Sequence, residues 1–468
     1  MSDAEDPGAA EPHAHHDHEH DHGVEGPGYA TPQAAIEEAE RERTAYVMGL
    51  YAGTDVAAPD FLAVVDVDPD SDTYGEVVNR LEMPNRGDEL HHFGWNACSS
   101  SCHVDGLERQ HLVIPGQRSS RIHVVDTKER RDPEFETVIE PEEVYEYDLS
   151  APHTVHCIPD GEILVSMLGD AEGELPGGFL ELNDDFEIEG RWDTAGDIEM
   201  NYDFWYQPRQ NVMLSTEWAA PKTYYPGFDL EDVEAGNYGQ RLHFWDWENG
   251  TVEQTIDLGE DGLIPLEARF LHTPESTHGF VGAALSSNII HFAERDGEYY
   301  AEPAIEFDDR EHPDWDMPVP ALVTDILVSM DDRYLFGSNW LHGEVWMYDV
   351  SDPSSPRRAD SISVGGYFGD IQAVQGRDIV AGPQMLQLSL DGERLYWTTS
   401  LFSSWDEQFF PEEGAKGSVM LKADVNPRKG TMELDEDFLV DFGEMPEGPA
   451  RAHEIRWPDG DCTSDVWQ

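Results

Sequence analysis

From Phe61 onward, short runs rich in aliphatic, β-branched and aromatic residues alternate with tight turns of the Asp-Gly, Pro-Asp-Gly and Asp-Asp kinds. Runs of this length bounded by turn residues predict strands. Ahead of them, Thr31 as a cap, followed by Pro32 and several glutamates, predicts a short helix over residues 31 to about 46. The pattern therefore predicts an all-β fold preceded by one helix.

The strand–turn–strand pattern also repeats. Residues 155–165 place Pro-Asp-Gly between two apolar runs, and residues 386–396 place Asp-Gly at the same point. Subtracting successive turn positions gives intervals of 49, 66, 56, 60 and 68 residues; the positions are Pro159, Pro208, Pro274, Met330, Leu390 and Pro458. Each interval accommodates one four-stranded blade, and a further blade fits residues 89–126. The repeat predicts a seven-bladed β-propeller, a closed fold with few exposed edges, as a single domain over residues 29–468.

Residues 1–28 differ in composition from the rest of the chain. They are rich in Ala, Asp, Glu, Pro and Gly, and six histidines alternate there with acids, namely His13, His15, His16, His18, His20 and His22. Such a segment cannot bury a core, so it is predicted to be a disordered His/acid-rich tail. Two interpretations stay open, a tail that gathers divalent metal ions and an acidic solubilising tail.

The chain carries 98 acidic against 28 basic residues, a formal net charge of −70. Repulsion on this scale strains a compact fold at low salt and is screened in molar salt. The composition is therefore typical of a cytosolic protein from a salt-accumulating halophile, with an acidic partner-binding protein as the alternative. Nucleic acid and anionic membranes are poor partners because both would be repelled. With no secretory signal or membrane-spanning apolar run visible, a cytoplasmic location is expected.

Histidines and acids recur just before the turns of the predicted innermost strands, where a propeller brings distant residues together at its central channel. The candidate metal ligands are His91, His92, His153, His156 and His453, with His342 as an outer-channel residue; the candidate proton carriers are Glu267, Asp203 and Asp325. Imidazoles suit copper and zinc. On a regular strand, each of the first two histidine pairs would point to opposite faces, so one or two histidines from each pair are expected at the site.

Two of the four cysteines, Cys98 and Cys102, lie within the same fifteen residues as the first histidine pair. Four cysteines are too few for a disulfide framework in a chain of this length. Cys98 and Cys102 are predicted to form a dithiol, and its role stays open between copper ligation or redox work, capture of selenium or persulfide, and local packing. Cys157 is interpreted as a buried unreactive cysteine or a third soft ligand.

Several segments in matching order carry a family resemblance. They include Ser-Ser-Arg-Ile-His-Val-Val-Asp at 119–126, Tyr-Asp-Phe-Trp-Tyr-Gln-Pro at 202–208 and Ser-Asn-Trp-Leu-His-Gly at 338–343. From residue 28 to its end the chain resembles the selenium-binding protein family, whose enzymatic members are methanethiol oxidases. The resemblance implies a seven-bladed propeller, a copper cofactor, and conversion of methanethiol, O₂ and water to formaldehyde, hydrogen sulfide and hydrogen peroxide. Copper suits this reaction better than zinc because zinc has no redox chemistry.

The chain also departs from that family. The cysteine motif is one serine longer than the Cys-Ser-Ser-Cys of most relatives, and Gly75 stands where some relatives have a cysteine linked with selenium binding. Stable selenium attachment is therefore not expected. A non-catalytic carrier of metal, selenium or thiol on the same propeller is the alternative function.

Overall fold

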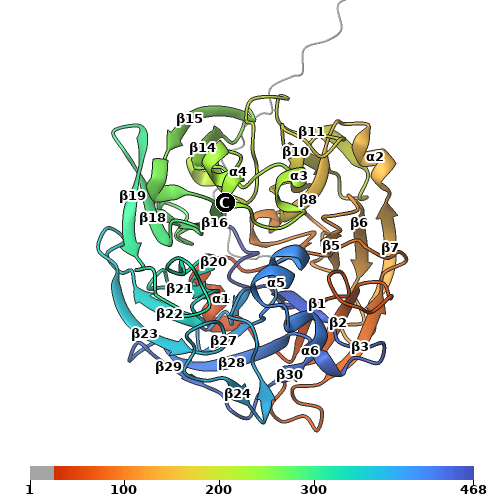
Figure 1. Ribbon diagram of the computed structural model, residues 1–468. Helices are drawn as coiled ribbons and strands as arrows, with labels where there is room; N and C mark the ends of the chain where they lie inside the picture. The colour runs from red at the N-terminus through yellow and green to blue at the C-terminus, as the bar shows by residue number, and fades with distance from the viewer. Residues whose placement is uncertain (1–25) are drawn as a thin grey trace, which may run out of the picture.

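The computed structural model describes residues 26–468, whose strands form seven four-stranded antiparallel sheets around a central axis (Figure 1). Each sheet is one blade of a β-propeller, which confirms the all-β, seven-bladed prediction. Residues 1–25 lie outside the described residues, so the His/acid-rich tail and the domain boundary near residue 28 stay predictions.

From the innermost strand outward, the first four blades are β31 (Arg451–Arg456), β1 (Thr44–Leu50), β2 (Phe61–Asp66) and β3 (Val77–Glu82); β4 (Gly94–Trp95), β5 (His111–Pro115), β6 (Ile122–Asp126) and β7 (Glu134–Ile139); β8 (Ser150–Cys157), β9 (Ile163–Gly169), β10 (Gly178–Leu182) and β11 (Ile188–Arg191); and β12 (Phe204–Gln207), β13 (Val212–Ser215), β14 (Arg241–Asp246) and β15 (Thr251–Asp257). The other three are β16 (Pro265–Phe270), β17 (Gly279–Ala283), β18 (Asn288–Arg295) and β19 (Glu298–Glu306); β20 (Val323–Val328), β21 (Tyr334–Asn339), β22 (Glu344–Asp349) and β23 (Arg357–Ser363); and β26 (Leu386–Leu388), β27 (Arg394–Trp397), β28 (Val419–Asn426) and β29 (Thr431–Leu434).

Short elements occupy the connections between strands. β30 (Val440–Asp441) pairs with β28, and β24 (Ala373–Val374) and β25 (Arg377–Asp378) form a separate hairpin. The helices are α1 (Pro32–Glu38), α2 (Pro141–Tyr145), α3 (Pro221–Tyr224), α4 (Leu230–Ala235), α5 (Ser403–Phe409) and α6 (Glu413–Lys416), with 3₁₀ turns η1 (Ser99–Ser101), η2 (Pro208–Gln210), η3 (Gly259–Gly262) and η4 (Phe442–Glu444). In Figure 1, α3, α4 and α5 lie over one end of the propeller.

The hydrophobic core lies between neighbouring blades. Every residue of the inner strands β8, β16 and β20 is buried, whereas the outer strand β15 alternates exposed and half-buried positions. Leu327 and Phe336 of one blade pack in one cluster with Leu395 and Trp397 of the next. These apolar faces are used in packing blade on blade.

The ring closes through its C-terminal strand. β31 pairs antiparallel with β1, with Tyr46 opposite Arg456 and Gly49 opposite Ala452. Near the end of the chain, the Trp467 indole N–H donates to the carbonyl of Tyr29 at 2.9 Å. This closure places β31, and with it His453, beside the first blades of the chain.

The helix predicted over residues 31 to about 46 is shorter than expected. Its start is correct, since the Thr31 hydroxyl accepts from the Ala34 N–H at 3.0 Å and Pro32 occupies the first turn, but it ends at Glu38. Tyr46 instead lies in β1, whose seven residues are all buried between β2 and β31. Burial and strand pairing outweigh the weak local preference for a helix.

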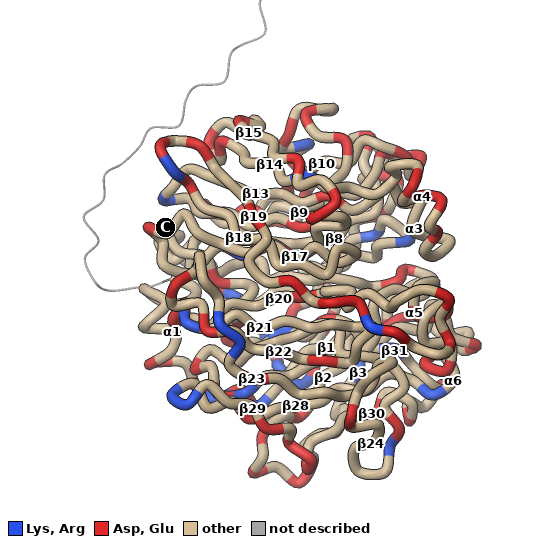
Figure 2. Tube along the Cα trace, turned by 60° about the vertical axis from the view of Figure 1, so that its left-hand side comes forward, with Lys and Arg blue, Asp and Glu red and all other residues tan. Residues whose placement is uncertain are grey.

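In the view of Figure 2, acidic residues are spread over many loops and strands, with fewer basic residues among them. This matches the even spread of acids along the chain. Within residues 26–468, no helix has both the length and the apolar character needed to cross a membrane.

Candidate metal centre

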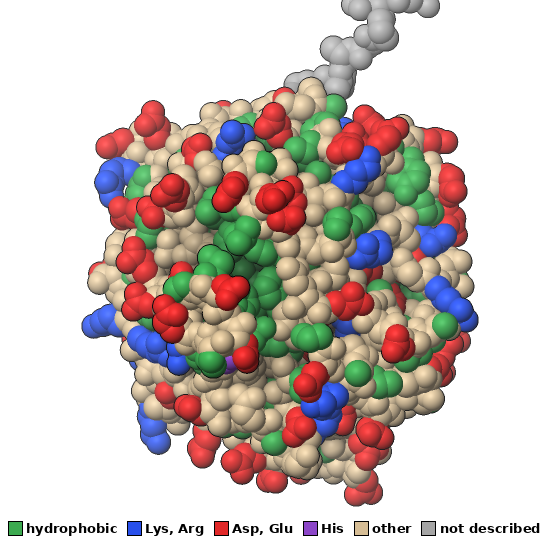
Figure 3. Space-filling view, viewed as in Figure 1, with side chains coloured by type: hydrophobic (Ala, Val, Ile, Leu, Met, Phe, Trp, Pro, Cys, Tyr) green, Lys and Arg blue, Asp and Glu red, His purple; other side chains and the backbone are tan. Residues whose placement is uncertain are grey.

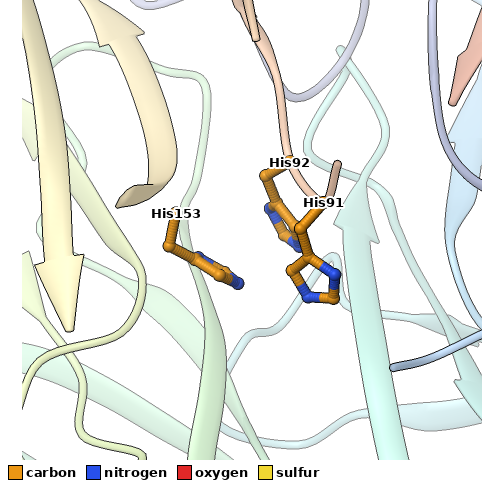
Figure 4. Close-up of side chains that lie close together, drawn as sticks. All are labelled: His91, His92 and His153. Carbon is orange, nitrogen blue, oxygen red and sulfur yellow. The ribbon is translucent and has the colours of Figure 1, made fainter. Parts of the chain in front are cut away.

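Four histidines from three adjacent blades meet at one end of the channel. One ring nitrogen from each of His91, His92 and His153 lies within 4.8 Å of the others, and all three residues are buried. Figure 4 shows the imidazoles of His91 and His92, from one segment, lying near that of His153, from another. The His453 ring stacks on His91 with 3.9 Å between ring centroids. We call His91, His92, His153 and His453 the histidine cluster.

Local irregularity explains which histidines enter the cluster. Residues 91–93 form no strand, so His91 and His92 escape the alternation of a regular strand and both reach the cluster. In β8 the pairing with β9 shifts register between Pro152 and Val155, next to His153. Sequence periodicity cannot show either feature, because each is a local break in the strand pattern.

The cluster is held in its neutral form. Burial, together with the neighbouring imidazoles, keeps the pKa of His91, His92 and His153 well below the usual range. Burial also lowers the pKa of His453 to about 3. Neutral imidazole is the form that binds a metal, so no proton has to leave these rings before an ion binds at ordinary pH.

Hydrogen bonds to the Nδ1 atoms fix two of the rings. His453 Nδ1 lies 2.8 Å from the Ser400 carbonyl oxygen, which can only accept, so Nδ1 carries the proton. The Thr154 hydroxyl donates to Asp203 at 2.8 Å and therefore accepts from His153 Nδ1 at 2.9 Å. Both Nε2 atoms are left as lone-pair donors, the arrangement typical of metal-bound histidine.

Unpaired nitrogen atoms test whether the cluster fits a metal. The Nε2 atoms of His92, His153 and His453 are buried and have no hydrogen-bond partner among the described residues. A buried polar atom without a partner costs about 1–3 kcal/mol. Bonds to a metal ion would satisfy these atoms, and an all-imidazole donor set suits copper, zinc, iron and nickel. The residues therefore fit a transition-metal ion.

A layer of buried charges adjoins the histidine cluster. Arg269 donates to Glu267 at 2.7 Å and to Asp203 at 2.8 Å, and lies 3.8 Å from Asp325. Burial and the neighbouring Asp203 hold the pKa of Glu267 well above its usual value, and burial raises the pKa of Asp325 to about 7. Glu267 Oε1 has no hydrogen-bond partner in the described structure and lies 3.7 Å from His92 Nε2. The structure thus brings together the three acids that the sequence singled out.

Residues 23–468 match the family described as 56 kDa selenium-binding protein. The chain belongs to this family. Methanethiol oxidases of Xenopus laevis and Homo sapiens are 49% and 48% identical to it, over 94% of this chain and 98% of theirs. Selenium-binding protein 2 of Arabidopsis thaliana is 48% identical over 94% of this chain and 95% of its own.

Solved structures agree with this membership. The X-ray structure of a hypothetical selenium-binding protein from Sulfolobus tokodaii superposes with a TM-score of 0.88 at 42% identity, covering 94% of this chain and 98% of that one. A putative 6-phosphogluconolactonase from Bacteroides fragilis, 10% identical with a TM-score of 0.55 over 89% of this chain and 98% of that one, shares the fold alone.

Two of the predicted ligands, His156 and His342, lie outside the histidine cluster. The His156 ring packs edge-on against Phe204 and Trp205 at about 5 Å. His342 Nε2 donates to the Val319 carbonyl at 3.0 Å, and its ring lies against Phe368. Both have the contacts of buried structural histidines, so the structure does not join either of them to His91, His92 and His153.

The cysteine pairing also differs from the predicted dithiol. Cys98 forms a disulfide with Cys157 of β8, across a sequence separation of 59 residues, and not with Cys102. Cys102 is a half-buried free thiol whose pKa is raised by burial, and Cys462 is buried and free. The bridge joins the segment after β4 to the innermost strand of the next blade. Spacing along the chain favoured the nearer thiol, whereas blade packing decides the partner.

Three further residues of the site were not identified from the sequence. Arg269 lies two residues from Glu267 on the inner strand β16, and this alternation of buried charges was an available signal. Thr154, which orients His153, had no signal beyond its position next to that histidine. The Tyr202 ring lies 4.0 Å from the His153 ring, and only the fold brings the two together.

Proposed function

We propose that this protein is a copper-dependent methanethiol oxidase that converts methanethiol, O₂ and water to formaldehyde, hydrogen sulfide and hydrogen peroxide. The relatives named methanethiol oxidase, about 48% identical over most of the chain, support an oxidoreductase with a small thiol substrate. The observation that carries the proposal is the buried histidine cluster with three unpaired Nε2 atoms. The cytoplasmic location and the halophilic source stay predictions.

In this proposal the metal is held by His91, His92 and His153, with His453 as the fourth nitrogen donor. Bound copper supplies one-electron chemistry and affinity for a thiolate sulfur. The protein's part is to keep these imidazoles neutral and to exclude bulk water by burial. Thr154 orients the ring of His153, and the Ser400 carbonyl orients the ring of His453.

Glu267 is the proposed proton carrier nearest the cluster. Burial raises the pKa of Glu267, so its carboxyl group keeps a proton. Because Oε2 accepts from Arg269, we place that proton on the unpaired Oε1, which lies 3.7 Å from His92 Nε2. Asp325, with one unpaired oxygen, is the proposed second carrier. Asp203 accepts from Thr154, Ala268 and Arg269, so we assign it the positioning of His153 instead. Proton transfer by a positioned carboxyl contributes typically about 10²–10⁴-fold to a rate.

The deciding experiment measures copper content together with oxygen uptake on methanethiol, using protein purified and held in multimolar potassium chloride. We expect turnover proportional to bound copper, with sulfide, formaldehyde and peroxide in equal amounts, and none in zinc-loaded protein. Folded, copper-loaded protein that consumes no oxygen would contradict the proposal. It would favour the carrier function, which relatives named selenium-binding protein also support.

A further inference from the structure

The innermost strand of the blade β4–β7 is interrupted by a β-bulge at residues 91–93. Leu90 bridges to Gly116, and the next pair along the ladder is Gly94 with Val113. Three residues on this strand therefore lie opposite two on the neighbouring one. An extra residue of this kind stays out of the ladder and re-aims the side chains around it. The bulge allows both of its histidines, although neighbours in the chain, to reach the histidine cluster.

Side chains of β31 take the place of a strand partner for Phe93, the last residue of the bulge. The Phe93 N–H donates to Glu454 Oε2 at 2.5 Å, and the Phe93 carbonyl accepts from Arg456 Nε at 2.8 Å. Arg456 Nη2 lies 2.6 Å from Glu454 Oε1, so the two side chains also form an ion pair. Because Phe93 is buried, its backbone groups need these partners. We call Glu454 and Arg456 the clamp.

The clamp also adjoins the ring of His92. Glu454 Oε1 lies 4.0 Å from His92 Nδ1, while Nε2 of that ring has no hydrogen-bond partner in the described structure. Glu454 directly follows His453, and the pairing of β31 with β1 shifts register there, so these two residues lie opposite Met48 alone. A second bulge thus places a ligand histidine and the clamp carboxyl side by side at the site.

Other acids of the inner strands make links of the same kind between blades. Asp203 accepts from the Ala268 N–H at 2.8 Å, and Asp325 accepts from the Leu386 N–H at 2.7 Å. Both links end on β16 and β26, strands that carry no member of the histidine cluster. Of these three links, the one from Glu454 ends beside two candidate metal ligands.

We propose that Glu454 and Arg456 are positioning residues of the metal centre: by bonding both backbone groups of Phe93, they fix the bulge that turns His91 and His92 toward the same ion. The assignment rests on the copper site of the proposed function. It concerns how tightly the ion is held and by how many imidazoles, and both quantities can be measured without a thiol.

The clamp lies inside the molecule, away from its open surface. Figure 3 shows apolar side chains gathered around a hollow near the centre of the face on which α3, α4 and α5 lie. Phe402, directly before α5, has its ring 6.0 Å from that of His91, so α5 begins close to the cluster. Phe93, Glu454 and Arg456 are buried, so substitutions at Glu454 exchange no side chain of that surface.

Reach and charge can be separated at Glu454. Glu454→Gln keeps the length of the side chain and an oxygen that can accept from the Phe93 N–H. Glu454→Asp keeps the charge beside Arg456 but is one methylene shorter. We expect copper affinity to fall about 10- to 100-fold in Glu454→Asp and by less than about threefold in Glu454→Gln. The nitrogen couplings in the electron paramagnetic resonance spectrum of copper-loaded Glu454→Asp should show fewer bound imidazoles.

Asp193 offers a matched control just after the outermost strand β11. It accepts from the Phe179 N–H at 2.8 Å and from Arg191 at 3.0 Å, the same kind of link away from the histidine cluster. Asp193→Ala should therefore leave copper affinity within about twofold and the spectrum unchanged, because distant sites act independently.

The ranking of the two Glu454 variants decides the assignment. Copper affinity lost in Glu454→Asp and kept in Glu454→Gln supports the clamp. Equal affinities in the two variants, or the reverse ranking, overturn it, because the reach to Phe93 would then not matter. Copper-loaded protein that shows the expected ranking but oxidises no methanethiol overturns the proposed function alone. Protein that binds no copper overturns both.

Discussion

The histidine cluster and the segment around Cys98 both contain residues that bind soft metals, but they differ in how far their polar atoms are hydrogen-bonded within the protein. At the histidine cluster, three buried Nε2 atoms have no partner in the described structure. At the other end, the segment around Cys98 is densely bonded: Ser99 donates twice to Asp465, at 3.0 and 2.6 Å, and the Tyr206 hydroxyl donates to the carbonyl of Cys157 at 2.6 Å. We call the residues 97–102 with Cys157 and Asp465 the cysteine end.

This contrast suggests that the histidine cluster binds a ligand and that the cysteine end has a structural role. Unsatisfied buried groups cost free energy and persist where a ligand satisfies them. Among the residues of the cysteine end, only Asp465 Oδ2 is a buried side-chain oxygen or nitrogen without a hydrogen-bond partner in the described structure. Both motifs are equally conspicuous in the sequence, as pairs of soft ligands within fifteen residues. Only their surroundings distinguish them, and the predictions below test that distinction.

The largest effect is expected from removing two imidazoles. Replacing His91 and His153 together by alanine should lower both bound copper and methanethiol oxidation by more than about 100-fold, because even the loss of a residue that only hydrogen-bonds to a metal ligand typically costs about 10- to 100-fold. Metal analysis and oxygen uptake measure the loss, and circular dichroism checks that the propeller is folded.

Replacing the buried His156 and His342 by alanine is the matched control and should retain copper. A His91/His153 variant with full copper and turnover would show that the metal binds elsewhere.

A smaller effect is expected from the residue that orients one ligand. Thr154→Val keeps the shape of the side chain but removes the hydroxyl that links His153 to Asp203, so copper affinity should fall about 10- to 100-fold. Competition with a chelator of known affinity measures the change. Thr154→Ser, which keeps the hydroxyl, should bind copper nearly as the unaltered protein does. Equal affinities in all three proteins would mean that the threonine has no positioning role.

How far the sequence predicts the molecule depends on whether a feature is local. Tight turns are encoded by a few adjacent residues, so their recurrence predicted seven blades. Counting back from the turns predicted that one or two histidines from each of the pairs His91/His92 and His153/His156 converge with His453. The break in strand register beside His153 and the absence of a strand at residues 91–93 depend on packing around the axis. Those irregularities let both His91 and His92 reach the histidine cluster, and they bring His153 there without His156.

The disulfide illustrates the same limit at longer range. Cys102 is four residues from Cys98 and Cys157 is 59 residues away, yet the bridge is made to Cys157 because adjacent blades bring β4 and β8 together. Sequence spacing carries no information on that contact. For Arg269 the sequence offers the nearby Glu267, whereas its contacts with Asp203 and Asp325 depend on the packing of three blades around the axis.

At the cysteine end we expect a loss of stability with little loss of activity. Cys98→Ser should lower the free energy of unfolding by about 2–4 kcal/mol, typical of a disulfide, and change copper content and turnover by less than about threefold. Denaturant titration and oxygen uptake measure the two quantities. Cys102→Ser is the control and should change neither. If Cys102→Ser instead lowered turnover tenfold or more, the cysteine motif would belong to the chemistry, as its sequence indicated.

The last prediction concerns Glu413, a buried acid that is the first residue of α6. Glu413 Oε1 accepts from the Thr399 and Ser418 hydroxyls, both at 2.7 Å, while Oε2 has no partner among the described residues. Burial, and then the nearby Asp406, raise the pKa of Glu413 to about 7 from its usual 4.5, against the opposing charge of Arg451. The folded protein therefore keeps a proton that the unfolded chain releases.

The sign of the pH dependence follows from that raised pKa. The contribution of Glu413 to stability is fully present below pH 4.5 and is lost as the pH rises to about 7, at up to about 1.4 kcal/mol per pH unit. Glu413→Gln cannot titrate, so its unfolding free energy should fall less between pH 5 and 7 than that of the unaltered protein. Denaturant titrations at constant high salt measure the difference. Acids that do not interact with Glu413 cancel because both proteins contain them, whereas any change in the titration of the neighbouring Asp406 is part of the measured effect. Parallel curves would show that Glu413 ionises normally, and that the hydroxyls of Thr399 and Ser418 stabilise its charged form.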